Sequence, residues 1–171
     1  MEQLLDLLLF LLPIYIANSS PVVLGGGAPL DLGVRLSDGE RVLGDGKTIR
    51  GFVGGTLAGT VAGGIVAVFY LLPFFPDQGT QFIAGFVLSF GTLFGDSVGS
   101  FIKRRAGVQS GMPFVLDTIA FLIVALLMAA PIANPRLYDI GNLAFFAVLT
   151  LILHPMMNML ANKAGLKKVP W

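Results

Sequence analysis

The chain has 171 residues, of which 55% are hydrophobic and only 12% charged, and its formal net charge is +1. Soluble domains carry about 25% charged residues, so this composition excludes an ordinary water-soluble protein and predicts one integral membrane domain over residues 1–171. The small net charge gives no reason to expect a nucleic-acid partner, and the lack of cysteine excludes disulfides and thiolate metal sites.

Several apolar runs approach the roughly 20 residues that a helix needs to cross a bilayer. They predict an all-α, polytopic membrane protein with five transmembrane helices, expected at about 3–24, 51–73, 79–102, 112–132 and 139–162. In the first helix, Pro13 and the polar residues 18–21 should kink or fray the second half. The fourth should begin near Pro113, because proline is favourable in a first helical turn.

The cations near the ends of these helices are unequally distributed. Lysine and arginine gather in the loops 25–50 and 103–111 and in the C-terminal tail, whereas the opposite connections contain only Arg136. Cationic loops remain on the cytoplasmic side of a membrane. We therefore expect a multi-pass protein of the cell membrane with its N-terminus outside, its C-terminus in the cytoplasm and its polar loops facing the cytoplasm.

Glycine recurs at every fourth position in the second and third predicted helices. The two series are Gly51, Gly55, Gly59 and Gly63, and then Gly91, Gly95 and Gly99. Glycines at this spacing share one helix face and let two backbones approach closely. Tight helix packing is the favoured interpretation, and a hinge or a substrate groove is the alternative.

The stretch "LFGDSVGSFIKRR" places Asp96 inside an apolar run that three cations terminate. Asp96, Ser100, Lys103 and Arg104 share one face of the predicted helix. Intramembrane carboxylates are usually functional, but plainer interpretations stay open. The cations would then only anchor the helix at the membrane surface, and Asp96 would pair with Arg104 merely to make its burial tolerable.

Asp117 gives the next predicted helix a second carboxylate at a similar depth from the same side. A divalent metal in this chain must rest on oxygen ligands, because the sequence has one histidine and no cysteine. Such ligands favour magnesium, manganese or calcium. We expect Asp96 and Asp117 to bind Mg²⁺.

The loop 25–50 contains "GDGKT", which is not a phosphate-binding P-loop because Arg41 stands where that motif requires glycine. Lys47, Thr48 and Arg50 nevertheless precede a helix whose free amides and positive dipole end favour an anion. A solvated basic loop is the alternative. Together with a carboxylate pair for metal, this pattern predicts phosphoryl or nucleotidyl transfer between a cytoplasmic nucleotide and a lipid phosphate.

Two segments carry a family resemblance. "GDSVGSFIKRRAGV" followed by "MPFVLD" resembles the signature of the CDP-diacylglycerol synthases, in which GD is followed by S-x-x-K-R, a glycine and a downstream aspartate. "GKTIRGFVGG" is similar to the K-T-W-E-G-F-x-G-G segment of that family. The length, the first loop and the ending "HPMMNMLANKAGLKKVPW" are more similar still to its archaeal branch, the CDP-archaeol synthase family.

The resemblance implies Mg²⁺-dependent transfer of CMP from CTP to an isoprenoid ether-lipid phosphate, digeranylgeranylglyceryl phosphate, giving CDP-archaeol and pyrophosphate. By matching positions, it implies Asp96 and Asp117 as metal ligands and Ser100, Lys103 and Arg104 as phosphate-binding residues. Lys47 and Thr48 match the family's K-T pair. Arg50 replaces the glutamate of the bacterial segment, and Ala120 replaces a second aspartate.

The remaining polar residues are assigned less narrowly. With Lys103 as a catalytic cation, Lys47, Arg50 and Arg104 are expected to neutralise the CTP phosphates. The loop acids Asp31, Asp38 and Asp45 could contact the ribose, the cytosine amino group or a second metal, and the sequence does not rank them. The polar residues His154, Asn158 and Asn162 share one face of the last helix and either line the cavity or join helices by hydrogen bonds.

Two other functions stay open at this point. A CTP-dependent lipid kinase would use the same residue types but release CDP instead of pyrophosphate. A small transporter would use Asp96 and Asp117 as intramembrane ion sites near the bilayer midplane.

Overall fold

Helices account for nearly all of the regular structure in the computed structural model, which describes residues 2–109, 112–167 and 169. They are α1 (Glu2–Ser19), α2 (Pro21–Leu24), α3 (Ile49–Phe69), α4 (Gln78–Arg105), α5 (Val115–Ala129), the 3₁₀ turn η1 (Pro135–Tyr138) and α6 (Ile140–Lys163). In these described ranges there is no β-strand, only two isolated bridges, Pro29 with Thr48 and Arg35 with Arg41. The all-α prediction is confirmed for the described residues.

The first predicted helix divides where its polar cluster lies. α1 ends at Ser19, and Pro21 begins the short α2 as its first residue. The hydroxyls of Ser19 and Ser20 donate to the backbone oxygens of Tyr15 and Ile16 at 2.6 Å, so they compete with backbone amides for these acceptors at the end of the helix. Pro13 lies inside α1. The break therefore follows from the local sequence, as predicted.

The fourth predicted helix is shorter than expected. It was predicted over 112–132, but α5 has only 15 residues and begins after Phe114, whose backbone is extended. Pro113 therefore precedes the helix instead of opening it, and an extended residue after a proline is sufficient to delay the first turn. Four helical stretches are long and apolar enough to cross a membrane, and α5 is a shorter apolar helix. Among the described residues, four of the five expected helices therefore have the length and composition of a membrane span, and the fourth, α5, is a shorter apolar helix.

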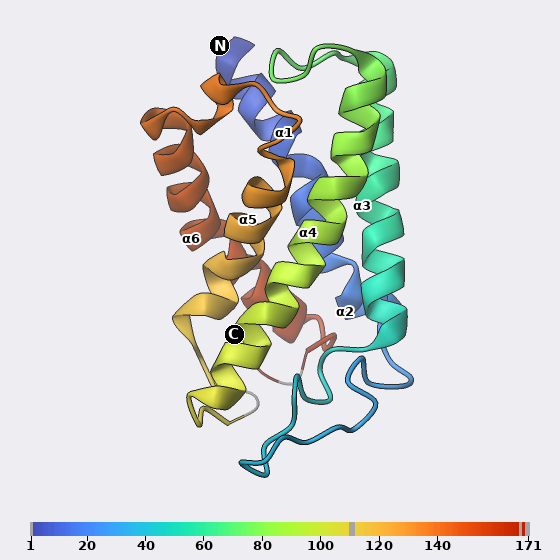
Figure 1. The fold of residues 1–171 in the computed structure, drawn as a ribbon, viewed down its shortest axis with the longest axis vertical. Helices are drawn as coiled ribbons and strands as arrows, with labels where there is room; N and C mark the ends of the chain where they lie inside the picture. Colours follow the sequence, from blue (N-terminus) through green and yellow to red (C-terminus); the bar gives the residue numbers. More distant parts are fainter. Residues whose placement is uncertain (1, 110–111, 168, 170–171) are drawn as a thin grey trace.

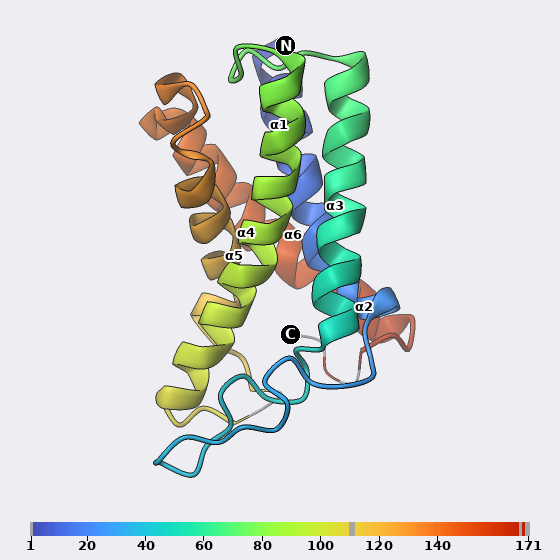
Figure 2. The same cartoon turned by 45° about the vertical axis from the view of Figure 1, so that its right-hand side comes forward.

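α1, α3, α4, α5 and α6 form one elongated bundle, as Figures 1 and 2 show. The N-terminus lies at one end of this bundle, together with the α3–α4 connection. The long loop between α2 and α3, the end of α4 and the start of α5 lie at the other end, where the C-terminal tail also turns in (Figure 1). The charged loops predicted to share one side of the membrane do lie at one end of the molecule.

The glycine series packs the central helices together. A side-chain carbon at Gly59 would come within 2.6 Å of the Pro13 oxygen in α1, and one at Gly63 within 2.7 Å of Gly85 in α4. On the other side of α4, a side-chain carbon at Gly95 would lie 2.7 Å from the Ala120 oxygen. α4 is thus in close backbone contact with both α3 and α5, and the prediction of tight helix packing is confirmed.

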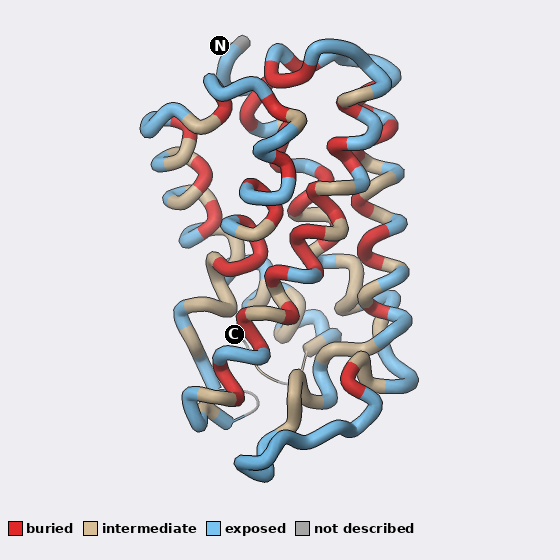
Figure 3. The backbone as a smooth tube through the Cα atoms, viewed as in Figure 1, coloured by how far each residue is buried: buried red, intermediate tan, exposed pale blue. Residues whose placement is uncertain are grey.

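The apolar core fills the half of the bundle that lies away from the long loop. Phe10 of α1 stacks on Phe146 of α6 with ring centroids 5.5 Å apart, and it meets Phe74 edge-on at 5.8 Å. Figure 3 shows the buried positions along the inner faces of the helices and the exposed ones on the loop 25–48. The bundle is therefore tightly filled at one end, whereas polar side chains converge at the other.

Candidate active site

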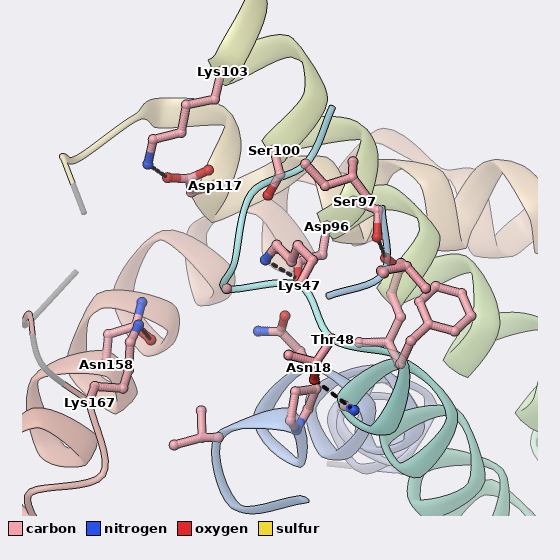
Figure 4. Close-up of a pocket in the computed structure, with 18 of the residues that line it drawn as sticks. Asn18, Lys47, Thr48, Asp96, Ser97, Ser100, Lys103, Asp117, Asn158 and Lys167 are labelled. Atoms are coloured by element: carbon pink, nitrogen blue, oxygen red, sulfur yellow. Dashed lines mark hydrogen bonds and ion pairs between the residues drawn. The ribbon is translucent and has the colours of Figure 1, made fainter. Parts of the chain in front are cut away.

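A cavity of about 400 Å³ lies at the polar end of the bundle (Figure 4). Its walls come from α2, the start of α3, the last turns of α4, the start of α5, the end of α6 and the C-terminal tail. Among the expected site residues, the ones that line it are Lys47, Thr48, Asp96, Ser100, Lys103, Arg104 and Asp117. Residues that are up to 70 positions apart in the sequence thus form one polar chamber.

Two lysine–aspartate pairs dominate this cavity. Lys47 Nζ donates to Asp96 Oδ2 at 2.5 Å, which joins the segment before α3 to the middle of the polar half of α4. Lys103 Nζ donates to Asp117 Oδ2 at 2.5 Å and to the Met112 oxygen at the same distance, which joins α4 to α5. Asp96 therefore pairs with Lys47, and the expected alternative of an Asp96–Arg104 pair is wrong.

Lys47 and Thr48 are held in place by the backbone of the loop. The Lys47 oxygen accepts from the Leu30 amide at 2.6 Å, and an isolated bridge pairs Pro29 with Thr48. Thr48 has an extended backbone, and its hydroxyl caps α3 by accepting from the Gly51 amide at 3.1 Å. This cap fixes where α3 begins and so directs Lys47 toward α4.

Arg104 of α4 supplies a third cation to the cavity, after Lys47 and Lys103. Its Nη1 donates to the Val108 oxygen at 2.9 Å. Its Nε is buried and has no hydrogen-bond partner among the described residues. An orphaned donor on a buried guanidinium is costly. Ser100 lies one turn before Arg104 and is also buried against the cavity.

Four loop residues expected near the substrate do not line the cavity. Arg50 is exposed on α3, and Asp45 has a side chain that is 88% exposed and pairs with Arg41 at 2.7 Å. Asp38 pairs with Arg105 at 2.6 Å and so ties the loop to the end of α4. Asp38 and Asp45 therefore lie on the loop surface, Arg50 lies on the exposed side of α3, and Asp31 lies at the centre of the loop.

Asp31 accepts hydrogen bonds from several residues of the loop 25–48 and so holds the loop together. Its carboxylate accepts from Arg41 Nη2 at 2.5 Å and from the amides of Leu43 and Gly44 at 2.9 Å and 3.0 Å. Burial by itself raises the pKa of Asp31, but these donors together with the Gly33 amide outweigh it and hold the pKa well below its ordinary value. The carboxylate is therefore ionised, and donors of the loop itself already fill its hydrogen-bonding capacity.

The far wall of the cavity contains polar residues that the sequence only partly indicated. His154 and Asn158 of α6 line it, and the Asn18 Nδ2 of α1 lies within hydrogen-bond distance of His154 Nδ1, at 3.2 Å. Both interpretations of the α6 polar face thus hold for His154, which lines the cavity and also joins two helices. Asn162 does not line the cavity, and its amide donates to the Lys167 oxygen at 2.8 Å.

The cavity offers a limited set of metal ligands. The described residues contain no group of three or more histidine, cysteine, aspartate or glutamate side chains that could hold an ion. Asp96 and Asp117 do line the same cavity, and so does Ser100. Mg²⁺ is commonly bound by one or two carboxylates plus substrate phosphates and water, so this oxygen-only donor set fits a metal that arrives with a nucleotide.

Comparison with known proteins adds an independent result. Residues 1–171 match the CarS-like family model, described as CDP-archaeol synthase. CDP-archaeol synthase from Pyrococcus horikoshii is 49% identical over 100% of this chain and 99% of that protein, and the one from Archaeoglobus fulgidus is 41% identical over 98% and 100%. A solved structure described as an intramembrane enzyme for archaeal membrane lipids biosynthesis is 37% identical, with a TM-score of 0.72 over 88% of this chain and 91% of that one.

Proposed function

This chain belongs to the CDP-archaeol synthase family, and from that membership we propose which reaction it performs and how. It is a membrane cytidylyltransferase. The proposed substrates are CTP and digeranylgeranylglyceryl phosphate, an unsaturated archaeal ether-lipid phosphate, and the products are CDP-archaeol and pyrophosphate. The placement of two lysine–aspartate pairs in one cavity beside the membrane-spanning helices carries this proposal.

The charges of the cavity suit a phosphate-rich substrate. Each carboxylate has a lysine within 2.5 Å, and Arg104 adds a buried cation with one unsatisfied donor. When a triphosphate enters, Lys47 and Lys103 can transfer their hydrogen bonds from carboxylate to phosphate oxygens without large movement. Cations placed where negative charge develops stabilise the transition state of phosphoryl-group transfer.

In the proposed reaction, an oxygen of the lipid phosphate attacks the α-phosphorus of CTP in line. A new bond forms between that oxygen and the α-phosphorus, and the bond from the α-phosphorus to the bridging oxygen of the β-phosphate breaks, so that its electron pair leaves with pyrophosphate. A phosphate monoester is largely dianionic at neutral pH, since its second pKa is about 6. No proton has to be removed from the nucleophile, and the cavity needs no general base.

Asp96 and Asp117 are the residues that would hold Mg²⁺. When bound, this ion supplies Lewis-acid charge neutralisation for the phosphate oxygens. Lys47, Lys103 and Arg104 bind and orient the triphosphate. Ser100 lines the same cavity, and its hydroxyl can donate a hydrogen bond to the substrate. Thr48 caps α3 and so fixes the position of Lys47, the residue before it.

For its location, we propose a cell-membrane protein whose cavity faces the cytoplasm. The loop 25–48, the last turn of α4 and the tail share one end of the bundle (Figure 1), and together they carry eight of the chain's eleven lysine and arginine residues. The positive-inside rule places such an end in the cytoplasm, where CTP is available. The N-terminus, at the opposite end, would then lie outside.

The decisive test uses the purified protein in mixed micelles with CTP labelled in the α-phosphate, Mg²⁺ and the ether-lipid phosphate. The expected products are a labelled lipid and an equal amount of pyrophosphate. Release of CDP with no label in the lipid would identify a kinase instead. Absence of both products, in a preparation that still binds CTP, would refute the proposed reaction.

A further inference from the structure

The C-terminal tail folds back into the cavity and brings a lysine that the proposed reaction has not yet used. α6 ends at Lys163, and the chain reverses at Gly165, whose φ of +73° is a conformation that side chains rarely adopt. The Gly165 amide donates to the Asn162 oxygen and the Leu166 amide to the Ala161 oxygen, both at 2.9 Å. This reversal places Lys167 in the cavity wall.

Lys167 is fixed at both its backbone and its side chain. Asn162 donates to its backbone oxygen at 2.8 Å, and its Nζ donates to Asn158 Oδ1 at 2.9 Å. Figure 4 shows Asn158 and Lys167 across the cavity from Ser97 and Ser100. The ammonium group is therefore held in a defined place on the wall opposite α4.

The cavity as a whole carries an excess of positive charge. Among the described lining residues, four are cationic and two are acidic, and the cations are Lys47, Lys103, Arg104 and Lys167. Burial lowers the pKa of Lys167, and repulsion from Lys47 lowers it further, while Asp96 and Asp117 act in the opposite direction. Gathering like charges in a partly buried chamber is unfavourable unless an anion offsets them.

The two walls differ in what lies behind them. Lys47 belongs to the loop 25–48, most of whose residues are exposed. Behind Lys167 lies α6, whose apolar stretch is only 11% buried, against 56% in α4. Exposed apolar residues cover the end of α6, namely Met156, Met157, Met159 and Leu160. A lipid that lies along α6 would bring its phosphate to the cavity from this side.

We propose that Lys167 binds the phosphate of the lipid substrate, while Lys47, Lys103 and Arg104 serve the nucleotide. The inference rests on the proposed function for the identity of the two substrates. It assigns to the C-terminal tail a direct role in substrate selection: the tail positions the nucleophilic phosphate opposite the triphosphate. Both substrates carry phosphate, so the test must separate the two sources.

Steady-state kinetics of Lys167→Met separate them, with Lys163→Met as the matched control, since Lys163 is an exposed lysine of the same segment that does not line the cavity. Loss of one hydrogen bond from an ammonium to a phosphate predicts a rise of about tenfold in KM for the lipid phosphate. The KM for CTP should change less than about twofold. Lys167→Arg should restore most of the lipid affinity, and Lys163→Met should leave both constants unchanged.

A binding measurement makes the inference independent of turnover. Wild-type protein in micelles should bind the ether-lipid phosphate more tightly than the same lipid without its phosphate, and Lys167→Met should remove most of this difference. A rise in KM for CTP alone, equal rises for both substrates, or no change in either would overturn the proposal. Failure of the wild-type protein to make CDP-lipid would refute the proposed function, whereas the binding comparison would still decide the role of Lys167.

Discussion

Two acid–base pairs, Asp31 with Arg41 and Asp96 with Lys47, contain the same kinds of charge but use them differently. The Asp31 side chain is 1% exposed, and donors from Arg41 and three backbone amides surround it. The Asp96 side chain keeps 21% exposure beside Lys47, and it faces a cavity of about 400 Å³. One carboxylate has its hydrogen-bonding capacity filled by its own loop, and the other keeps capacity for a ligand.

The number of hydrogen bonds that a carboxylate already accepts from the protein therefore separates a structural role from a binding role better than its charge does. A carboxylate has about four lone-pair sites. Donors fixed in the backbone of the loop fill those of Asp31, so a substrate would have to displace them. A flexible lysine is the partner of Asp96, and it can turn toward a phosphate when one arrives. The pair that faces the cavity should therefore control catalysis, and the saturated pair should control stability.

The sharpest way to break this comparison is to neutralise the cavity carboxylates. Asp96→Asn and Asp117→Asn should each lower kcat/KM by about 10³-fold or more, because each removes a proposed ligand of the ion that neutralises the phosphates. Asp96→Asn should change stability little, because the Lys47–Asp96 pair is partly open to solvent. Asp117→Asn should also lower stability, because it removes the carboxylate partner of the buried Lys103. The measurements are the labelled-CTP assay and thermal unfolding in micelles.

Ser97→Ala is the matched control for these variants, because Ser97 lines the same cavity and its hydroxyl donates to the Leu93 oxygen at 2.8 Å within α4. It should keep activity within a few-fold of wild type. Wild-type turnover in both asparagine variants, with an unchanged Mg²⁺ dependence, would show that the two carboxylates do not bind the metal.

The partner of Asp96 should give the next largest effect. Lys47→Met removes a cation from the triphosphate side of the cavity, and loss of one such donor typically costs about 10²-fold in rate. Lys47→Arg should recover part of the activity because it keeps the charge but changes the donor geometry. The discriminating measurement is KM for CTP against KM for the lipid phosphate. A change confined to the lipid would mean that Lys47 faces the other substrate.

Asp31→Asn tests the opposite half of the comparison. It should lower the free energy of unfolding by about 2 kcal/mol, the usual cost of losing hydrogen bonds to a charged group, and reduce activity only as far as the loop loosens. Thermal unfolding in micelles measures the first effect. An unchanged melting temperature with a raised KM for CTP would instead support the sequence-based expectation that Asp31 contacts the nucleotide.

The same pair predicts a dependence on pH. The pKa of Asp31 is lowered in the folded chain, so its contribution to stability is fully present above the ordinary carboxyl pKa of about 3.9 and declines as the pH falls below it. The difference in melting temperature between wild type and Asp31→Asn should therefore stay constant from about pH 7 to pH 5. It should shrink when the pH falls below about 4. A difference that disappears above pH 5 would contradict the assignment.

Much of the fold was predictable because its signals are local. The hydrophobic runs gave the helices, the polar residues before Pro21 gave the break after α1, and the glycine spacing gave the close contact of α3 with α4. The delayed start of α5 was missed because Phe114 is extended, and the Met112 oxygen just before it accepts from Lys103 of α4. No local pattern reports such a contact.

The candidate site was predictable where motif spacing placed residues on one helix face, as for Asp96 and Lys103. The partners of these residues were not predictable, because Lys47 reaches Asp96 only through the fold of a loop 49 positions earlier in the chain. Lys167 was missed for the same reason, although Gly165 four positions after Ala161 is a typical signal for a chain reversal at a helix end. Loop acids were assigned to the substrate because sequence does not show which carboxylates the backbone saturates.

Asp45 provides the smallest and most discriminating effect. It bonds the same arginine as Asp31, at 2.7 Å from Arg41 Nη1, but its side chain is 88% exposed. Exposed ion pairs contribute little, because water competes for both partners. Asp45→Asn should therefore change kcat/KM by less than about twofold and the melting temperature by about 1 °C or less. A tenfold rise in KM for CTP would instead mean that the loop moves onto the nucleotide during turnover. The hydrogen bonds that fill a carboxylate would then no longer separate a structural role from a binding role.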